Sequence, residues 1–419
     1  MKLIADLQIH SRFSRATSPS INLANLEKYS KLKGINLLGT GDFTHPKWLA
    51  ELKSELKEDG SGILTSSSGF HFVLQGEISN IYTQDGKGRR VHNLLLARNF
   101  EIVEQINAAL LKKGRLDYDG RPMFGFSCVE LVEMMKEIDD DIEIIPAHAW
   151  TPWYGIFGSM TGFDSVEECF KEYAHKIHAI ETGLSSDPAM NWRLSKLDKY
   201  TLLSSSDAHS FWPWRLGREA NIFDTEWSYD DLLQAIRNKK GFAETIEMWP
   251  HEGKYHYTGH RNCDVCLSPK ESLKIKNICP KCRKPLTVGV AQRVEQLADR
   301  KEGFVPENAV PFRNLIPLSE VIAGTIGERV ESRKTWEEYH KLIKEFGNEF
   351  NVVLEAEENK LKKTTSEKIA ENIIKNRNQK IPFKPGYDGV YGIPIFDEKE
   401  IKEEKTLPKI KQYGLDEFI

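Results

Sequence analysis

Short apolar runs alternate with segments of helical periodicity over the first 240 residues of the chain. The runs predict buried strands at residues 35–39, 142–146, 177–181 and 201–204. Apolar positions at helical spacing predict helices at residues 22–33, 101–112 and 127–138. Two further strands, at residues 70–77 and 91–97, flank a turn-like stretch and are expected to form a hairpin. This alternation predicts a barrel-like α/β domain, and a doubly wound sheet is the alternative.

The pattern changes after residue 240 and predicts three further parts. Residues 241–290 hold paired cysteines and are expected to form a small zinc module, and residues 291–396 are predicted to be mainly helical. Residues 397–419 are strongly charged, which predicts a flexible tail. With the barrel at residues 1–240, the chain of 419 residues is expected to contain these four parts.

Composition excludes some classes of protein. The formal net charge is −4, so nucleic-acid binding would have to use local basic patches. No apolar run is long enough for a membrane span, and Asp6 interrupts the first apolar segment too early for a signal peptide. Because four cysteines are spaced for metal rather than for disulfides, we expect a cytoplasmic protein with no membrane partner.

Histidines and acids stand at the ends of the predicted strands. They are His10, Asp42 with His45, Glu77, His92, His148, Glu181, and Asp207 with His209. In a β/α barrel the carboxyl ends of the strands face one site, so these side chains are expected to converge. A single buried histidine is usually structural, but charged groups repeated after apolar strands are rarely buried unpaired. The set indicates metal ions that activate water for phosphoester hydrolysis.

These residues resemble the motifs of the polymerase-and-histidinol-phosphatase (PHP) superfamily of trinuclear metallo-phosphoesterases. The matching segments are Asp6-Leu7-Gln8-Ile9-His10, Gly41-Asp42-Phe43, Gly76-Glu77-Ile78, His92, Ala147-His148 and Ser206-Asp207-Ala208-His209. The resemblance implies a distorted (β/α)7-type barrel whose metals are held by His10, Asp42, Glu77, His92, His148, Asp207 and His209. It also implies catalytic roles for Asp207, Glu77 and His148, with Glu77 as the bridging carboxylate.

Two positions depart from the PHP pattern. Gln8 and Phe43 stand where the superfamily has histidines. Gln8 could ligate weakly through its amide oxygen, whereas Phe43 cannot ligate and the nearby His45 could substitute for it. Glu181 is either a further ligand or a partner of one. Because an oxygen-richer site suits hard cations, we expect Mg²⁺ or Mn²⁺ for catalysis, together with Zn²⁺ in the site.

Four cysteines form the most specific motif of the chain. Cys263-x-x-Cys266 is followed by Cys279-x-x-Cys282, which predicts a tetrahedral structural zinc site. Such a site would hold together a small module that lacks a core of its own. The neighbouring Lys281 and Arg283 could also contact DNA phosphates, although a run of charge is usually a solvated face.

Loops rich in tryptophan follow three of the strand-end residues. We expect base or DNA contacts from Trp150, Trp153, Ser185, Asn191, Trp192, Arg193, Trp212, Trp214 and Arg215. Aromatic rings and arginines offer stacking surfaces to an unstacked base. The alternative is that these side chains pack between the barrel and the zinc module.

The last eight residues resemble a sliding-clamp-binding peptide. Its anchors would be Gln412, Leu415, Phe418 and Ile419. A short turn could place the apolar side chains in a hydrophobic pocket of a clamp of the PCNA type. Ile419 departs from the usual pair of terminal aromatic residues. The alternative is a terminal segment that docks on the body of the protein.

Taken together, the barrel motifs, the cysteine quartet and the tail resemble the endonuclease Q family. The resemblance implies a DNA-repair endonuclease that cuts on the 5′ side of deaminated bases (uracil, hypoxanthine, xanthine) and of abasic sites, leaving 3′-hydroxyl and 5′-phosphate ends. Composition and spacing alone indicate only a zinc-containing metallo-phosphoesterase. Two alternatives stay open: a small-molecule phosphatase or exonuclease on the same barrel, and a clamp-bound sensor of DNA lesions without activity.

Overall fold

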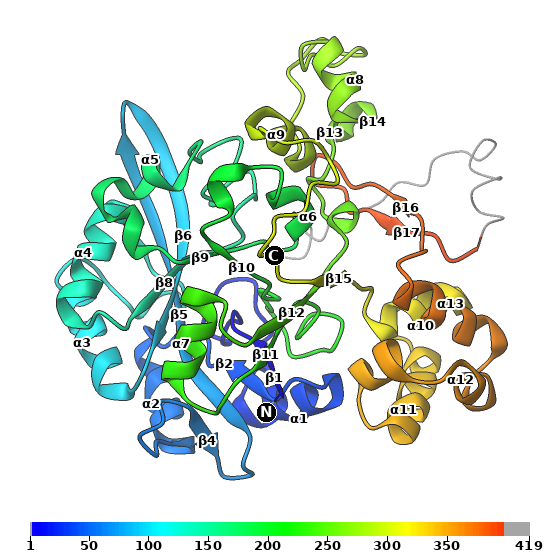
Figure 1. Cartoon of the computed structure of the whole chain (residues 1–419), viewed down its shortest axis with the longest axis horizontal. Coiled ribbons are helices and arrows are strands. Elements are labelled where there is room, and N and C mark those ends of the chain that lie inside the picture. Colours follow the sequence, from blue (N-terminus) through cyan, green and yellow to red (C-terminus); the bar gives the residue numbers. More distant parts are fainter. Residues whose placement is uncertain (1, 398–419) are drawn as a thin grey trace.

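One large mixed sheet organises the chain, whose computed structural model describes residues 2–397 (Figure 1). Its main path runs in the order β15 (Phe312–Asn314), β12 (Phe242–Glu247), β11 (Ala220–Asp224), β1 (Lys2–Asp6), β2 (Leu37–Gly39), β5 (His71–Gln84), β4 (Leu64–Ser66) and β3 (Leu56–Lys57). Three more strands branch from this path: β6 (Lys87–Ala97), β7 (Met123–Phe124) and β8 (Glu143–Pro146). The sheet extends beyond residue 240, because β12 and β15 belong to it.

The pairing directions exclude a doubly wound parallel sheet. Strand β1 runs parallel to β2 but antiparallel to β11, and β5 runs antiparallel to β6. The β5–β6 pair is the expected hairpin, longer than predicted. Gln84 pairs with Lys87 across a two-residue loop in which Asp85 and Gly86 both have positive φ. An Asp-Gly loop of this kind twists the two strands in the sense that a sheet requires.

Nine strands enclose a common apolar interior. One buried cluster includes Leu3 and Ala5 of β1, Leu37 of β2, Val73 of β5, Leu94 of β6, Ile145 of β8, Ala179 of β9 (Ala179–Glu181), Leu203 of β10 (Thr201–Leu203), Phe223 of β11 and Phe242 of β12. Side chains alternate across a strand, so one residue in two along each strand can face this interior. The expected α/β class with a central sheet is therefore confirmed.

The hydrogen-bond ladders of the described residues do not close this ring into a regular barrel. Strands β9 and β10 form a separate two-stranded sheet. On one side, Ala149 N donates to Glu181 O (3.0 Å) just past β8 and β9. On the other side, the Asn221 side chain accepts from Ser204 N (2.9 Å) and donates to Ser204 O (2.7 Å). The buried Asn221 amide thus replaces a backbone ladder between β10 and β11, and the expected (β/α)7 regularity is not confirmed.

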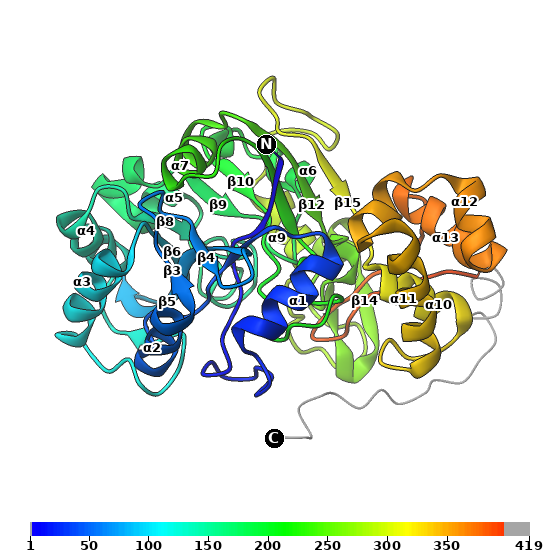
Figure 2. The ribbon, with the colours of Figure 1, turned by 90° about the horizontal axis from the view of Figure 1, so that it is seen from below.

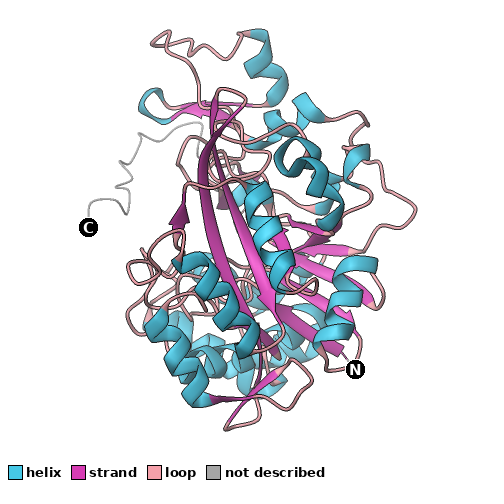
Figure 3. Cartoon of the chain, turned by 90° about the vertical axis from the view of Figure 1, so that its left-hand side faces the viewer, coloured by secondary structure: helices cyan, strands magenta, loops and turns pink. Residues whose placement is uncertain are grey.

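Helices cover the outside of the sheet (Figure 3). They are α1 (Leu23–Lys33), α2 (Pro46–Glu55), α3 (Phe100–Leu111), α4 (Cys128–Ile138), α5 (Val166–Phe170), α6 (Pro188–Asn191) and α7 (Tyr229–Asn238). The predicted capping box begins α4: Ser127 Oγ accepts from Glu130 N (3.2 Å), and Ser127 N donates to Glu130 Oε2 (2.8 Å). Short 3₁₀ turns lie at Lys171–Lys176, Ser195–Leu197, Pro250–Glu252 and Arg261–Cys263.

Two smaller parts follow the sheet (Figure 1). The cysteine module consists of β13 (Thr258–His260), β14 (Val265–Leu267), α8 (Pro269–Lys274) and α9 (Val290–Leu297). The predicted helical region contains α10 (Leu318–Ile326), α11 (Arg333–Phe346), a π turn (Asn351–Glu355), α12 (Glu358–Thr364) and α13 (Glu367–Arg377), followed by the β16 (Phe383–Lys384) and β17 (Ile393–Pro394) pair. No helix within residues 2–397 is both long and apolar enough to cross a membrane.

A buried ion pair connects the helical region to the sheet domain. The bodies of these two parts lie toward opposite ends of the molecule (Figure 2). Lys33 Nζ, at the end of α1, donates to Glu349 Oε1 (2.6 Å) and to Pro213 O (2.8 Å). Glu349 also accepts from Leu318 N (2.9 Å) and from the Tyr339 hydroxyl (3.0 Å). The side chains of Lys33 and Glu349 are 2% and 1% exposed, so each charge depends on the other for compensation.

Candidate active site

Three of the strand-end residues have a left-handed backbone. Asp42 (φ 42°), His148 (φ 33°) and Asp207 (φ 48°) follow β2, β8 and β10. Residues other than glycine rarely adopt this conformation, and such strain is concentrated at functional sites. The three turns bring an imidazole and two carboxylates to the same end of the enclosed interior.

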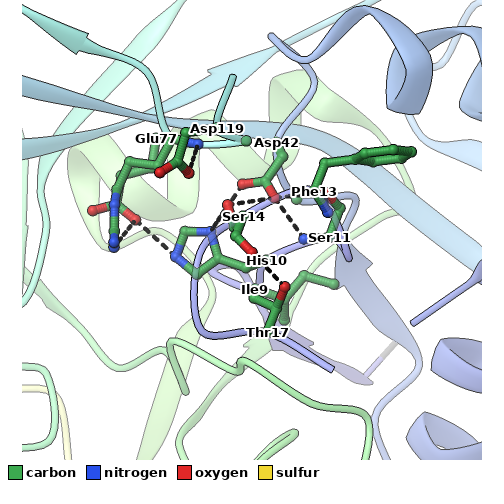
Figure 4. A network of polar contacts seen from close by, with 12 residues as sticks. Ile9, His10, Ser11, Phe13, Ser14, Thr17, Asp42, Glu77 and Asp119 are labelled. Atoms are coloured by element: carbon green, nitrogen blue, oxygen red, sulfur yellow. Dashed lines mark hydrogen bonds and ion pairs between the residues drawn. The ribbon is translucent and has the colours of Figure 1, made fainter. Parts of the chain in front are cut away.

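His10 is the centre of one half of the site (Figure 4). Its Nδ1 lies 2.8 Å from Asp42 Oδ1, and its Nε2 lies 3.0 Å from Glu77 Oε2 and 3.1 Å from Asp207 Oδ1. Ser11 holds the other Asp42 oxygen with two hydrogen bonds, from its N (2.6 Å) and its Oγ (2.7 Å). Asp42 is thus fixed in place and in turn orients the His10 ring.

Glu77 joins this half of the site to the other. Its Oε1 lies 2.6 Å from His92 Nδ1 and 3.6 Å from His148 Nε2. These two ring nitrogens are themselves only 3.2 Å apart. Two imidazole nitrogens and a carboxylate oxygen that converge in this way form an arrangement typical of ligands around a cation.

The ligand atoms fall into two groups that fit metal ions. The members of each group lie within 4.8 Å of one another, and they are His10, Asp207 and His209 in one and Glu77, His92 and His148 in the other. His10 Nε2, Glu77 Oε1 and Asp207 Oδ1 are buried, and within the described residues their close contacts with one another and with His92 lack hydrogen-bond geometry. Buried polar atoms without partners are costly, and a bound cation would satisfy them.

The protonation states suit metal binding at the carboxylates and at His92, whereas nearby carboxylates raise the pKa of His10 and His148 against the effect of burial, so that a cation would displace a proton from these two rings. Burial opposes the ionisation of Glu77, but the neighbouring His92 holds the pKa of that carboxyl well below its usual range. Burial likewise opposes the ionisation of Asp207, and His209 keeps its pKa low. Burial lowers the pKa of His92 to about 4, so this ring is neutral at physiological pH. Ionised carboxylates and neutral imidazoles are the forms that coordinate metals.

Two solved structures resemble the whole chain. The crystal structure of the lesion-specific endonuclease PfuEndoQ from Pyrococcus furiosus matches with a TM-score of 0.85 and 30% identity, over 97% of this chain and 100% of that one. A structure of endonuclease Q in complex with a 27-mer duplex substrate, with an abasic lesion at the active site, matches with a TM-score of 0.85 and 31% identity, over 96% and 98% of the two chains.

The chain belongs to the endonuclease Q family. The family described as the MJ0043 C-terminal domain matches residues 317–380, which include α10 to α13. The uncharacterized protein MJ0043 of Methanocaldococcus jannaschii is 32% identical over 316 residues, which are 72% of this chain and 38% of that protein. The chain therefore spans less than half the length of that relative.

Phe43 and the nearby His45 are part of the packing of this chain. Phe43 is fully buried, and a Cβ added to Gly76 would lie 3.2 Å from its ring. His45 does not join either ligand group, because its ring stacks on Phe13 with 4.3 Å between the ring centroids. The structure therefore places no imidazole where the superfamily has its second strand-end histidine.

Gln8 and Glu181 lie beside the two groups rather than within them. Gln8 Nε2 donates to Glu77 Oε2 (3.1 Å), while Gln8 Oε1 is buried and has no hydrogen-bond partner within residues 2–397. Glu181 accepts a hydrogen bond from His148 N (3.1 Å), and burial raises the pKa of this carboxyl to about 8. In this arrangement Gln8 and Glu181 orient the residues that carry the ligand atoms.

Both ligand groups open onto a cavity of about 610 Å³. His92, His148 and Asp207 line it together with Arg121. Its rim carries aromatic and basic side chains, including Trp153, Tyr154, Lys254, Tyr255 and Tyr391. The sequence did not point to Arg121, because it follows no apolar strand, and Gly120 and Pro122 beside it indicated only a loop.

The tryptophan-rich loops divide between this cavity and the packing of the molecule. Trp153 and Ser185 line the cavity, and their contact with a base stays a prediction. Trp150 Nε1 instead donates to Asn191 Oδ1 (2.8 Å), and both side chains are buried. The remaining candidates contact other parts of the fold: Trp192 meets Phe312, Arg193 pairs with Glu295, Trp212 and Trp214 meet Trp336, and Arg215 lies in a neighbouring cavity beside Glu320.

The cysteine module brings together three of the four predicted cysteines and a histidine. The group consists of His260, Cys263, Cys279 and Cys282, and Cys266 is exposed outside it. The register of β13 and β14 explains the exchange: His260 pairs with Val265, which is buried beside Cys279, whereas Cys266 pairs with Gly259 on the opposite face. Desolvation opposes ionisation of Cys279, but the N–H of Cys282 and the His260 ring lower the pKa of its thiol to about 6.

This geometry predicts different outcomes for two substitutions in the module. His260→Ala should remove about one zinc equivalent per chain and destabilise the module, because a structural zinc site needs four ligands. Cys266→Ser should keep the zinc, since Cys266 lies outside the group. Metal content per chain by atomic emission, with thermal unfolding as the second readout, checks both. Loss of zinc from Cys266→Ser together with its retention in His260→Ala would restore the four-cysteine assignment.

Proposed function

We propose that this chain is a DNA-repair endonuclease that hydrolyses the phosphodiester on the 5′ side of a damaged nucleotide. The damaged nucleotides are those with a deaminated base (uracil, hypoxanthine or xanthine) and abasic sites. The observation that carries the proposal is the pair of ligand groups joined by Glu77 at a cavity of about 610 Å³. The solved relative with an abasic lesion at its active site supports the same substrate class.

The proposed metal ligands are the residues of the two groups together with Asp42. His10, Asp207 and His209 would hold one ion and Glu77, His92 and His148 another, with Asp42 paired to His10. Ions bound there would supply a hydroxide near neutral pH and positive charge next to phosphate oxygens. Mg²⁺ or Mn²⁺ is proposed for catalysis and Zn²⁺ as a further occupant, since the donor set mixes oxygen with imidazole nitrogen.

The chain's own residues then set the position of the reacting groups. Asp42, anchored by Ser11, keeps the His10 ring directed at Glu77 and Asp207. Attack of water in line at phosphorus, with release of the 3′ oxygen, leaves a 3′-hydroxyl and a 5′-phosphate. Pre-organisation of this kind accounts for a large part of the rate in phosphoryl transfer, because the ligands do not have to rearrange during the reaction.

Recognition of the lesion is proposed to use the same cavity. Deamination replaces an exocyclic amine, a hydrogen-bond donor, by a keto oxygen, an acceptor. A cavity lined with N–H donors would therefore pair with a deaminated base. With the undamaged base, one of these donors would stay without an acceptor. Trp153 and Tyr154 at the rim offer faces on which an extruded nucleotide could stack.

The remaining parts are assigned to binding. We propose that residues 1–240, completed by β12 and β15, form the catalytic barrel of PHP type. The zinc module, expected at residues 241–290, is proposed to consist of β13, β14, α8 and α9, and its exposed Lys281 and Arg283 would meet DNA phosphates. The helical region, expected at residues 291–396, is proposed to begin at α10, after β15. The predicted clamp-binding motif at Gln412, Leu415, Phe418 and Ile419 lies outside the described residues, and binding of a PCNA-type clamp by this tail stays a prediction.

A substrate panel tests the proposed function. End-labelled duplexes with one deoxyuridine, deoxyinosine, deoxyxanthosine or abasic site should be nicked in the presence of Mg²⁺ or Mn²⁺, whereas the undamaged duplex should stay intact. Release of phosphate from nucleoside monophosphates, or nibbling from duplex ends without internal nicks, would instead establish a phosphatase or an exonuclease. Lesion binding with no cleavage, at about one zinc per chain and no further metal, would establish a sensor.

A further inference from the structure

The loop before β7 carries Arg121 to the acidic centre of the site. Strand β7 runs parallel to β5, with Ser79 opposite Met123. Two residues earlier on each side, Glu77 and Arg121 are therefore expected to be neighbours, and Arg121 Nη1 indeed lies 3.8 Å from Glu77 Oε2. The pairing of the two strands thus fixes the place of this arginine.

Gly120 packs the loop that carries Arg121 tightly against the candidate active site. Its N donates to Phe13 O (3.0 Å), and its O accepts from Thr44 Oγ1 (3.1 Å). A Cβ at this position would lie 2.3 Å from Asp42 Oδ2 and 2.5 Å from Ser14 Oγ. Only a residue without a side chain allows the backbone to pack so closely on a ligand carboxylate. Arg121 is therefore held on a rigid support.

The guanidinium of Arg121 has unused donors that face the cavity. Among residues 2–397 no group accepts a hydrogen bond from it, since its nearest carboxylate oxygen is the one at 3.8 Å. Its side chain is 21% exposed and lines the same cavity as His148 and Asp207. Arg218 lines this cavity too, but its Nε and Nη2 both donate to Ser206 O. Arg121 can therefore donate hydrogen bonds to a ligand that enters the cavity.

The charge balance of the site indicates what this ligand is. Asp42, Glu77 and Asp207 are carboxylates that repel an incoming phosphate. Gln8 and Phe43 leave fewer ligands for cations than the PHP pattern has, so less cationic charge is available from metals. Arginine stays charged at every physiological pH, and its planar fork matches two phosphate oxygens.

We propose that Arg121 binds the non-bridging oxygens of the scissile phosphate and positions it over Glu77 and Asp207. This inference rests on the proposed function and adds a phosphate-binding residue to it. The Arg121 guanidinium would supply positive charge that, in the PHP pattern, comes from metal ions held by the two histidines that this chain lacks. Because it is pre-organised, it would contribute both to binding of the phosphodiester and to the rate of its cleavage.

Cleavage of an abasic duplex gives the first test. Arg121→Gln should lower kcat by about 10²-fold or more, with metal content and thermal unfolding unchanged, because one pre-organised donor group is lost. Arg121→Lys should recover part of the rate, since it restores the charge but not the fork. Arg115→Gln is the matched control: the same change on an exposed arginine that pairs with Asp117 should leave cleavage unchanged.

Binding to a neutralised phosphate gives the decisive test. In the full-length Asp207→Asn background, Arg121→Gln should weaken binding of an abasic duplex by about tenfold or more. A methylphosphonate at the scissile position removes the charge of that phosphate. With this duplex, the chains with and without Arg121→Gln should bind equally well. Equal weakening for both duplexes, or no weakening, would overturn the inference while the proposed function stands. A wild-type chain that neither binds nor nicks abasic DNA would overturn both.

Discussion

Asp207→Asn is expected to abolish cleavage of lesion-containing DNA while most of the binding is retained. Asp207 Oδ1 lies 3.1 Å from His10 Nε2 and belongs to one of the two ligand groups. An amide removes the charge and presents its oxygen as a weaker ligand. The rate of nicking should fall by about 10³-fold or more, as for other residues that act as a unit with their partners.

Binding should change much less than the rate does. Affinity for duplex DNA comes mainly from many phosphate contacts spread over the surface, so one substitution within the cavity should alter Kd by less than about tenfold. Single-turnover nicking and fluorescence anisotropy on the same abasic duplex separate the two effects. Asp85→Asn is the control, because Asn-Gly suits the β5–β6 turn as well as Asp-Gly does. Joint loss of binding and cleavage would show that Asp207 only maintains the fold.

Lys33→Met is expected to cause a large loss of stability at a position outside the site. The change leaves Glu349 buried at 1% exposure without its cation. Breaking one side of a buried ion pair costs about 3–5 kcal/mol, because the remaining charge is uncompensated. The loss should appear as a lower midpoint of urea unfolding for the helical region, which Lys33 connects to the sheet domain.

Two further variants isolate the cause. Lys31→Met removes a surface ion pair with Glu27 from the same helix, where the lysine is 51% exposed, and should cost no more than about 1 kcal/mol. Lys33→Met combined with Glu349→Gln should recover much of the stability, since neither charge then stays buried alone. If the midpoints of Lys33→Met and Lys31→Met coincide, the buried pair does not hold the two parts together.

Local rules predicted much of the site and some of the fold. The residues at strand ends do converge: His10, Asp207 and His209 form one group, and Glu77 joins the other. The capping box at Ser127 and the Asp85-Gly86 turn also follow from short-range chemistry. Such features depend on a few neighbouring residues, which is why sequence alone reveals them.

Other features depend on strand pairing and packing between distant segments. The exchange of Cys266 for His260 follows from the register of β13 and β14, and Arg121 reaches Glu77 through the pairing of β7 with β5. Trp212 packs against Trp336, more than a hundred residues away in the chain, so the abundance of tryptophan near the candidate site partly reflects packing. No local pattern records these contacts, because register and domain packing are properties of the whole fold.

Nucleotide-resolution mapping of the cut on an abasic duplex tests the central claim most directly. The duplex carries one abasic site and a label on either end of the damaged strand, and wild-type chain is added with Mg²⁺ or Mn²⁺. The account predicts a single nick immediately 5′ of the lesion, with a 3′-hydroxyl that a polymerase extends and a 5′-phosphate. Cuts at undamaged positions, a cut on the 3′ side, or an intact duplex at full metal occupancy would contradict it.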